Sequence, residues 1–333
     1  MRISASIYSD KKRDLQETIA DLSAHHVDLL HVDCNDDLSV FDDIKRVREW
    51  CKIPIDLHII TKTPSKYFDL LRENPVEYVT FQLEDATESL DLPSDIPGKK
   101  GLAIITPTSV SAFDAYSNYD FILIMATIPG QSGGVFDAVN FKKIRDFQKK
   151  YPSKSVHVDG GVNGEVSFIL RNMGVHTSVS GSYLFNAPSI GHALMDLTKR
   201  DVQSQFKVKD FMIPLEESPS ILANGTSSLD ALKSIEVGNL GFTMVLGGTN
   251  ELQGLISNAD IRKALIKNNG TVTSLPIESI MNASPLVIQS DATVNDLLQQ
   301  IKKYAFPIMY MPVVESGKAV GIVTFLNLIK GEI

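Results

Sequence analysis

The sequence predicts an α/β fold, a (β/α)₈ TIM barrel over residues 1–200 that is followed by a smaller α+β domain. Short runs rich in β-branched residues alternate there with amphipathic helical stretches. Eight such β-then-α units fit into about 200 residues, near the lower size limit of this barrel. Polar residues whose side chains can bind a metal or transfer a proton also stand at the ends of several strands, where barrels of this class build their active sites.

Eight strands are expected in the barrel, and a stretch that could form a helix follows each of them. The helical pattern is weakest around Ala86–Asp91, before the turn-rich LPSDIPGKKG. A doubly wound open sheet is the alternative, but it would have fewer strands and a glycine-rich loop after the first, where this chain has SDKKRDL. The expected strands are Ile3–Ile7, Leu29–Asp33, Ile55–Ile60, Tyr78–Leu83, Gly101–Thr106, Phe121–Thr127, Ser155–Asp159 and Val179–Ser182.

Composition narrows the class of protein. A hydrophobic content of 43% is enough for ordinary globular cores, and a net charge of −8 without a basic face argues against a nucleic-acid partner. No apolar run is long enough to span a bilayer, and the N-terminal segment turns polar too early for a signal peptide. Two cysteines, Cys34 and Cys51, make no disulfide framework. We therefore expect a cytoplasmic protein that binds neither nucleic acid nor membrane.

Four residues at strand ends carry the candidate chemistry. His31 and Asp33 are two positions apart in HVD, so they point to the same side of their strand. His58 lies near the end of the third strand, and Asp159 closes the seventh. Two imidazoles and two carboxylates suit Zn²⁺, Fe²⁺ or Mn²⁺ better than Mg²⁺, which prefers oxygen ligands. The pattern predicts one divalent metal held by all four.

The ligand types also indicate a reaction. A metal bound to O2 and O3 of a ketose would polarise the carbonyl and stabilise an enediolate. Asp33 and Asp159, from strands far apart around the ring, could accept and donate a proton on opposite faces of the substrate. That arrangement would invert the carbon between them.

Glycines and a serine after the last two strands predict a phosphate cradle. The loops after strands seven and eight are the usual phosphate site of this fold. The run PGQSGG, Pro129–Gly134, reads as a loop that could close over substrate. The cradle residues are Gly160, Gly161, Gly181 and Ser182.

The barrel region resembles ribulose-phosphate 3-epimerases. SASIYSD, HVDCND, DLHII, MATIPGQSGG, VDGGV and SGSYLF occur in that family's order and spacing across Ile3–Asn186. The resemblance implies that His31, Asp33, His58 and Asp159 are the metal ligands, and that Asp33 and Asp159 are the acid/base pair. It further implies contacts with substrate, its phosphate or the metal environment by Ser6, Met125, Gly130, Gly161, Gly181 and Ser182.

The chain departs from the family in the lining of the site. Asn35 and Ile60 stand where the family usually has methionines, and Gln82 replaces a usual histidine. Ala5 replaces a proline, and Ser132 and Gly134 alter the glycine-rich loop. All four ligands are kept, which favours metal chemistry, whereas the changed lining leaves the choice of sugar phosphate open.

Residues 207–333 look like one unit used twice, over 207–270 and 274–333, after a link at Lys199–Phe206. Each half reads β–α–β–β–α, and the pair resembles tandem CBS domains. In GLISNADIRKAL, Ser257 and Asp260 match the hydroxyl and acid that often contact an adenosine nucleotide in that family. The second half has Thr324, with Asn327 in place of the acid. Two other readings are that Ser257 and Asp260 simply cap a helix, and that the pair only dimerises.

The sequence thus favours an enzyme of the isomerase class, a metal-dependent epimerase at C3 of a ketose phosphate. Ribulose 5-phosphate is the first choice of substrate, and the CBS pair is expected to provide nucleotide regulation. We expect a homo-oligomer. The alternatives are an epimerase of a hexulose 6-phosphate, permitted by Asn35 and Gln82, and a non-catalytic sensor of sugar phosphate or nucleotide.

Overall fold

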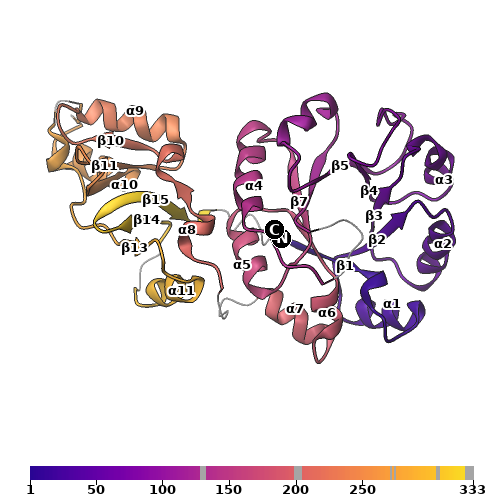
Figure 1. The fold of residues 1–333 in the computed structure, drawn as a ribbon. Coiled ribbons are helices and arrows are strands. Elements are labelled where there is room, and N and C mark those ends of the chain that lie inside the picture. Colours follow the sequence, from indigo (N-terminus) through magenta and orange to yellow (C-terminus); the bar gives the residue numbers. More distant parts are fainter. Residues whose placement is uncertain (128–132, 199–204, 271, 274, 305–307, 327–333) are drawn as a thin grey trace. The chain divides into compact units, whose positions relative to one another are not determined.

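The chain forms two compact units, built on Met1–Val202 and on Gln203–Leu326. The structure is a computed structural model that describes residues 1–127, 133–198, 205–270, 272–273, 275–304 and 308–326 (Figure 1). Among these residues, no helix combines the length and the apolar character that crossing a membrane requires.

The first unit is a closed barrel of eight parallel strands in sequential order, with β8 returning to pair with β1. The predicted barrel is therefore confirmed, and each strand bound lies within two residues of its expected place. The strands are β1 (Arg2–Ser6), β2 (Leu29–Asn35), β3 (Ile55–Ile60), β4 (Tyr78–Gln82), β5 (Lys99–Ile105), β6 (Phe121–Met125), β7 (Ser155–Asp159) and β8 (Thr177–Ser180).

Helices surround the barrel (Figure 1). In α4, Phe141, Ile144 and Phe147 recur at helical spacing, and all three are buried. The helices are α1 (Leu15–Ala24), α2 (Val40–Trp50), α3 (Phe68–Glu73), α4 (Val139–Lys150), α5 (Gly164–Asn172), α6 (Ser182–Asn186) and α7 (Ile190–Thr198), with 3₁₀ turns η1 (Ile7–Ser9), η2 (Pro64–Tyr67) and η3 (Val110–Tyr116).

Two of the expected helices are wrong. The connection from β4 to β5, all of it described, contains turns and no helix. Pro93 and Pro97 cannot donate a backbone N–H, and Gly98 has a φ of +83°, so a regular helix cannot run through residues 93–98. The connection from β5 to β6 forms only η3, whose serine, aspartate and tyrosine residues are modest helix formers.

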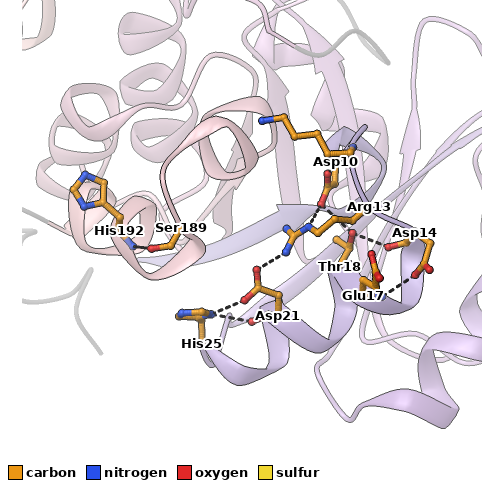
Figure 2. Close-up of polar contacts among 10 residues, drawn as sticks. Asp10, Arg13, Asp14, Glu17, Thr18, Asp21, His25, Ser189 and His192 are labelled. Carbon is orange, nitrogen blue, oxygen red and sulfur yellow. Dashed lines mark hydrogen bonds and ion pairs between the residues drawn. The ribbon is translucent and has the colours of Figure 1, made fainter.

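The link from β1 into α1 is fixed by a polar network (Figure 2). Asp10 accepts hydrogen bonds from Arg13 Nε at 2.6 Å and Thr18 Oγ1 at 3.0 Å. Arg13 also reaches Asp21 in the middle of α1, and Asp14 caps the helix by accepting from the backbone N–H of Glu17 at 2.8 Å. The segment that follows β1 at the barrel mouth is thereby held in place.

Strand register brings the candidate ligands to one level of the barrel. His31 pairs with Asp56, Asp33 with His58, and Met125 with Asp159. Below this level, the side chains of Leu29, Tyr78 and Phe121 from alternate strands form one apolar cluster. Such layering fills the barrel, so the polar groups stand on a packed floor.

The second unit contains two sheets. The first holds β10 (Ser220–Leu222), β11 (Phe242–Leu246) and β12 (Leu252–Ser257), with α9 (Ser228–Gly238) and α10 (Asn258–Lys267). The second holds β13 (Ile288–Gln289), β14 (Tyr310–Glu315), β15 (Lys318–Thr324) and β9 (Ile213–Pro214), with α11 (Val294–Lys302). The remaining elements are α8 (Val208–Phe211), η4 (Leu215–Glu217) and η5 (Ile277–Ser279).

The first half follows the expected β–α–β–β–α order, and the second follows it through β15; its last helix would lie outside the described residues. The short strand β9, which precedes the first half, pairs antiparallel with β15 of the second. Phe242 and Leu255 of one sheet share a buried cluster with Ala319 and Ile322 of the other. The two halves therefore bury apolar surface against each other.

Candidate metal centre

The four side chains singled out in the sequence meet at the carboxyl ends of the strands. His31 and Asp33 come from β2, His58 from β3 and Asp159 from β7. One potential ligand atom from each lies within 4.8 Å of all the others. Both imidazoles are fully buried, and each carboxylate keeps 19% of its side chain exposed. The group is therefore fixed from below and open toward the barrel mouth.

His31 presents Nε2 to this group. That atom lies 3.2 Å from Asp33 Oδ1 and 3.8 Å from Asp159 Oδ2. On the other side of the ring, Nδ1 lies 3.0 Å from Asp56 Oδ2, which also accepts a hydrogen bond from Ser4 Oγ at 2.9 Å. Because a carboxylate can only accept, Nδ1 donates to Asp56, and Nε2 donates to Asp33 while no ion is bound. A bound cation would replace the proton on Nε2.

His58 presents the other ring nitrogen. Its Nδ1 lies 3.5 Å from Asp33 Oδ1 and, among the described residues, has no hydrogen-bond partner although it is buried. A buried polar atom without a partner costs free energy unless something absent from the protein chain satisfies it. Nε2 of the same ring lies 3.0 Å from Gln82 Oε1.

These residues fit a divalent cation. Bonds of about 2.1 Å to nitrogen and oxygen would place ligand atoms on opposite sides of one ion about 4.2 Å apart, so a small contraction closes the group around an ion. Two neutral imidazoles and two carboxylates form the mixed donor set of Zn²⁺, Fe²⁺ or Mn²⁺. An ion would also satisfy the unpartnered Nδ1 of His58.

The two carboxylates differ in their affinity for a proton. Burial raises the pKa of Asp159 to about 6, and the charge of Asp33 adds to this effect. Burial acts in the same direction on Asp33, but the charge and hydrogen bonds of His31 and His58 outweigh it and lower the pKa of Asp33. Burial likewise opposes the charged form of His31, but Asp33 and Asp56 raise its pKa well above the usual value. Neighbouring carboxyls whose pKa values are pushed apart suit an acid/base pair.

Two further predicted residues pair in register with members of this group, Ser6 with His31 and Met125 with Asp159. Ser6 ends β1 and is 9% exposed, with its Oγ 3.1 Å from Ser9 Oγ. Met125 ends β6, is buried, and pairs in register with Asp159. Gly130 and Ser132 lie outside the described residues.

The expected cradle residues lie at two places where neighbouring connections approach each other closely. A Cβ on Gly160 would stand 2.3 Å from Thr127 Oγ1, and one on Gly161 would stand 2.2 Å from the backbone nitrogen of Phe136. A Cβ on Gly181 would stand 2.3 Å from Ser9 Oγ. These glycines therefore permit the loop after β7 to approach the loop after β6, and the loop after β8 to approach the turn after β1.

The end of the eighth strand was predicted two residues too late. Ser182 begins α6 and Gly181 precedes it, whereas β8 ends at Ser180. Gly181 has φ −115° and ψ −95°, outside the extended region, so its backbone cannot continue the strand. Both residues still stand at the carboxyl end of the barrel.

Sequence reasoning missed Asp56, which orients His31. The signal was available, because Asp56 and His58 are two positions apart in IDLHII, the same spacing as His31 and Asp33. Gln82 was identified only as a departure from the family. Its contact with His58 depends on the register of β3 and β4, which the sequence does not specify.

In the second unit, Ser257 and Asp260 cap α10 reciprocally. Ser257 Oγ accepts from the backbone N–H of Asp260, and Asp260 Oδ2 accepts from the backbone N–H of Ser257 at 3.0 Å. Equivalent boxes begin α9 and α11, so this geometry alone does not distinguish a ligand site. Thr324 ends β15 and is 8% exposed, and Asn327 lies outside the described residues.

Comparisons with known proteins assign the barrel region to a family. The model of the family described as "Ribulose-phosphate 3 epimerase family" matches residues 2–185, more than half of the chain. The cytoplasmic isoform of ribulose-phosphate 3-epimerase from Oryza sativa subsp. japonica is 28% identical over 49% of this chain and 75% of its own length. The ribulose-phosphate 3-epimerase of Methanocaldococcus jannaschii is 27% identical over 64% of this chain and 95% of its own length.

A second family model, for the CBS domain, matches residues 277–332. Among solved structures, that of CBSX2 in complex with AMP is 26% identical, covers 38% of this chain and 96% of its own, and has a TM-score of 0.31. The chain belongs to the ribulose-phosphate 3-epimerase family, as an enzyme of the epimerase class whose barrel is followed by a CBS-type domain.

Proposed function

We propose that the protein is a metal-dependent epimerase that inverts C3 of a ketose phosphate, with ribulose 5-phosphate as the favoured substrate. The observation that carries this proposal is the meeting of His31, Asp33, His58 and Asp159 within 4.8 Å at the barrel mouth. Family membership supports the same reaction. The four residues would hold one ion, Zn²⁺, Fe²⁺ or Mn²⁺.

The aspartates perform the proton transfers in this proposal. When bound, the cation polarises the ketone carbonyl and offsets negative charge on the enediolate. Asp33, whose pKa is lowered, takes the proton from C3 on one face, and Asp159, whose pKa is raised, returns a proton on the other. The reverse reaction exchanges the two roles. Strands β1 and β8 lie between β2 and β7, so the two carboxylates approach the substrate from separate positions on the rim.

Substrate orientation would come from the glycine-lined loops. Gly160, Gly161 and Gly181 allow backbone N–H groups to approach a phosphate closely, and Ser182 follows at the same rim. Ser6 and Met125 would contact the sugar from β1 and β6. Gly130 is assigned to the same substrate site by its place in the family motif.

The test is deuterium exchange at C3 in D₂O. The metal-loaded protein should exchange deuterium into C3 of ribulose 5-phosphate and form its C3 epimer, as measured by proton NMR. Asp159→Asn should stop formation of the C3 epimer, whereas Asp120→Asn, which alters a carboxylate that accepts a hydrogen bond from the backbone N–H of Lys100 near the start of β6, should not. Retained epimer formation in the Asp159 variant would remove that residue from the proton transfer.

A hexulose 6-phosphate is a second candidate substrate. Asn35 and Gln82 supply amide groups where the family motif usually has a methionine and a histidine, and an additional hydroxyl group on a longer sugar could form hydrogen bonds with them. Exchange with a hexulose phosphate and none with ribulose 5-phosphate would favour this substrate. Tight sugar-phosphate binding without exchange would instead favour a sensor.

We further propose that the CBS pair binds an adenosine nucleotide through Ser257, Asp260 and Thr324 and thereby adjusts barrel activity. Asp260 could accept hydrogen bonds from a ribose diol. Asp230→Asn is the matched control, because Asp230 caps α9 as Asp260 caps α10. Asp260→Asn should weaken AMP binding in calorimetry and the control should not. Equal loss in both variants would assign the effect to capping.

We infer that the protein works in the cytoplasm as a homo-oligomer that binds neither nucleic acid nor membranes. Its two cysteines are buried and unpaired, as in proteins of reducing compartments. Light scattering on the eluted protein would report the oligomer, and a single-chain mass would exclude it.

A further inference from the structure

The second imidazole of the candidate metal centre depends on a neutral amide for its orientation. His58 is fully buried, and its Nε2 lies 3.0 Å from Gln82 Oε1. Gln82, at the end of β4, is itself only 1% exposed. An amide can present either oxygen or nitrogen to a ring nitrogen, so the role of Gln82 depends on what fixes its orientation.

Glu84 fixes that orientation. The side-chain nitrogen of Gln82 donates to Glu84 Oε2 at 2.5 Å and faces the carbonyl oxygen of Ala103 at 3.4 Å. Both partners can only accept, so the amide nitrogen must point toward them and the amide oxygen toward His58.

Glu84 is in turn held by the segment after β5. Its Oε1 accepts from the backbone N–H of Ile105 at 3.0 Å and from the hydroxyl of Thr108. Neither carboxylate oxygen can turn away from its partner without losing a charge-assisted hydrogen bond. The orientation of Gln82 is therefore built into the loop after β5.

The protonation of His58 follows. Because Gln82 Oε1 can only accept, Nε2 of a neutral His58 carries the proton, and Nδ1 is left with its lone pair. Nδ1 is the buried nitrogen that, in the described residues, has no hydrogen-bond partner, and it faces Asp33 Oδ1 at 3.5 Å. Without Gln82, the Asp33 carboxylate would favour the opposite tautomer, whose Nδ1–H would occupy the place of a cation.

We propose that Gln82 is a positioning residue of the metal centre, which selects the Nε2–H tautomer of His58 with Glu84 as the clamp of its amide. This inference rests on the proposed metal site. Asp56 has the corresponding role for His31, where its carboxylate accepts from Nδ1. One imidazole is thus backed by a charged acceptor and the other by a neutral one, so His31 is the more basic ligand.

Two readouts test this, and one needs no metal. In metal-free protein, ¹⁵N-detected histidine spectra should show His58 as the Nε2–H tautomer, and Gln82→Leu should move it toward Nδ1–H. Competition with a fluorescent chelator should give a metal Kd weakened about 10- to 100-fold in Gln82→Leu, the usual effect of losing such a partner. Gln148→Leu is the control, because it makes the same substitution at a partly buried glutamine outside the metal centre, which donates to Met173 O at 2.8 Å.

The double variant Gln82→Glu with Glu84→Gln provides the rescue. It exchanges donor and acceptor between the two side chains and keeps an acceptor facing His58, so the wild-type tautomer and most of the metal affinity should return. Failure of this rescue, when the variant melts like the wild type, would contradict the inference.

The outcomes separate the two proposals. If the wild type binds no ion, the metal-dependent function fails. If it binds an ion, and Gln82→Leu keeps the same tautomer and the same Kd, only the positioning role of Gln82 fails.

Discussion

His157 offers a quantitative test of the barrel interior. It lies on β7, is 1% exposed, and stacks on Phe121 with ring centroids 4.1 Å apart. Among the described residues, neither of its ring nitrogens has a hydrogen-bond partner. Burial lowers its pKa to about 3, and nearby positive groups, among them His176 and Lys99, add to this against the opposing charge of Asp56. We therefore expect a histidine that stays neutral in the native state and becomes charged on unfolding.

Proton linkage gives the direction and the size of the change in stability with pH that His157 causes. Below the ordinary histidine pKa of 6.5, the unfolded chain binds a proton that the native barrel does not, so stability falls as pH drops from 6.5 toward 3. At about pH 5, some 1.5 pH units below the unfolded pKa, this costs about 2 kcal/mol, at about 1.4 kcal/mol per unit. Near pH 7.5 the cost vanishes.

The perturbation is His157→Leu, which removes the titrating ring at similar volume. Trp50 of α2 is the single tryptophan, so its fluorescence in urea reports unfolding of the barrel. Both proteins are measured with a chelator at about pH 5 and pH 7.5. The difference in unfolding free energy, variant minus wild type, should rise by about 2 kcal/mol at the lower pH.

A packing loss from the leucine would be the same at both pH values and would cancel in this comparison. His192→Leu is the control, because the His192 side chain is 50% exposed and meets water in either state. Equal pH dependence in wild type and His157→Leu would refute a neutral, buried His157.

Three further predictions concern function and local structure. Asp159→Asn should lose formation of the C3 epimer, measured by proton NMR, while its Trp50 urea transition is kept, and a shifted transition would mean that the fold, not proton transfer, was damaged. Gly161→Ala should lower the free energy of unfolding by about 2–4 kcal/mol, since its φ is +66° and its Cβ would meet backbone at 2.2 Å. Gly133→Ala, with φ +88° and open space, should cost about 1–2 kcal/mol, and equal losses would argue against that close approach. Ser257→Ala should remove about 1 kcal/mol of capping and speed amide exchange in α10 about fivefold, and unchanged exchange would contradict the cap.

Much of the barrel could be predicted from sequence because parallel strands buried on both faces read as continuous apolar runs. Phe121–Met125, with the sequence FILIM, is such a run. Ile55–Ile60 and Ser155–Asp159 match their predicted bounds because apolar residues alternate there with polar ones, which is the period of a strand. The connection after β4 was misjudged because prolines and a glycine override weak helical spacing there. Strand β9 could not be foreseen, because two residues carry no periodicity and gain their partner only in the folded unit.

The site also has a part that the sequence could predict and a part that it could not. Side chains that end a strand with an alternating pattern, such as His31 and Asp33, could be placed on one face from spacing alone. The contact of Gln82 with His58 could not, because it joins neighbouring strands whose relative register depends on packing. Nor could the spacing of Ser257 and Asp260 separate capping from ligand binding, because both uses need the same residue types at the start of a helix.

The most direct test of the central claim is an anomalous difference map from crystals grown with Mn²⁺ or Zn²⁺. We expect one peak at about 2.0–2.3 Å from His31 Nε2, His58 Nδ1 and an oxygen of each of Asp33 and Asp159. A map without that peak, in which the four side chains keep direct contacts with one another, would contradict it.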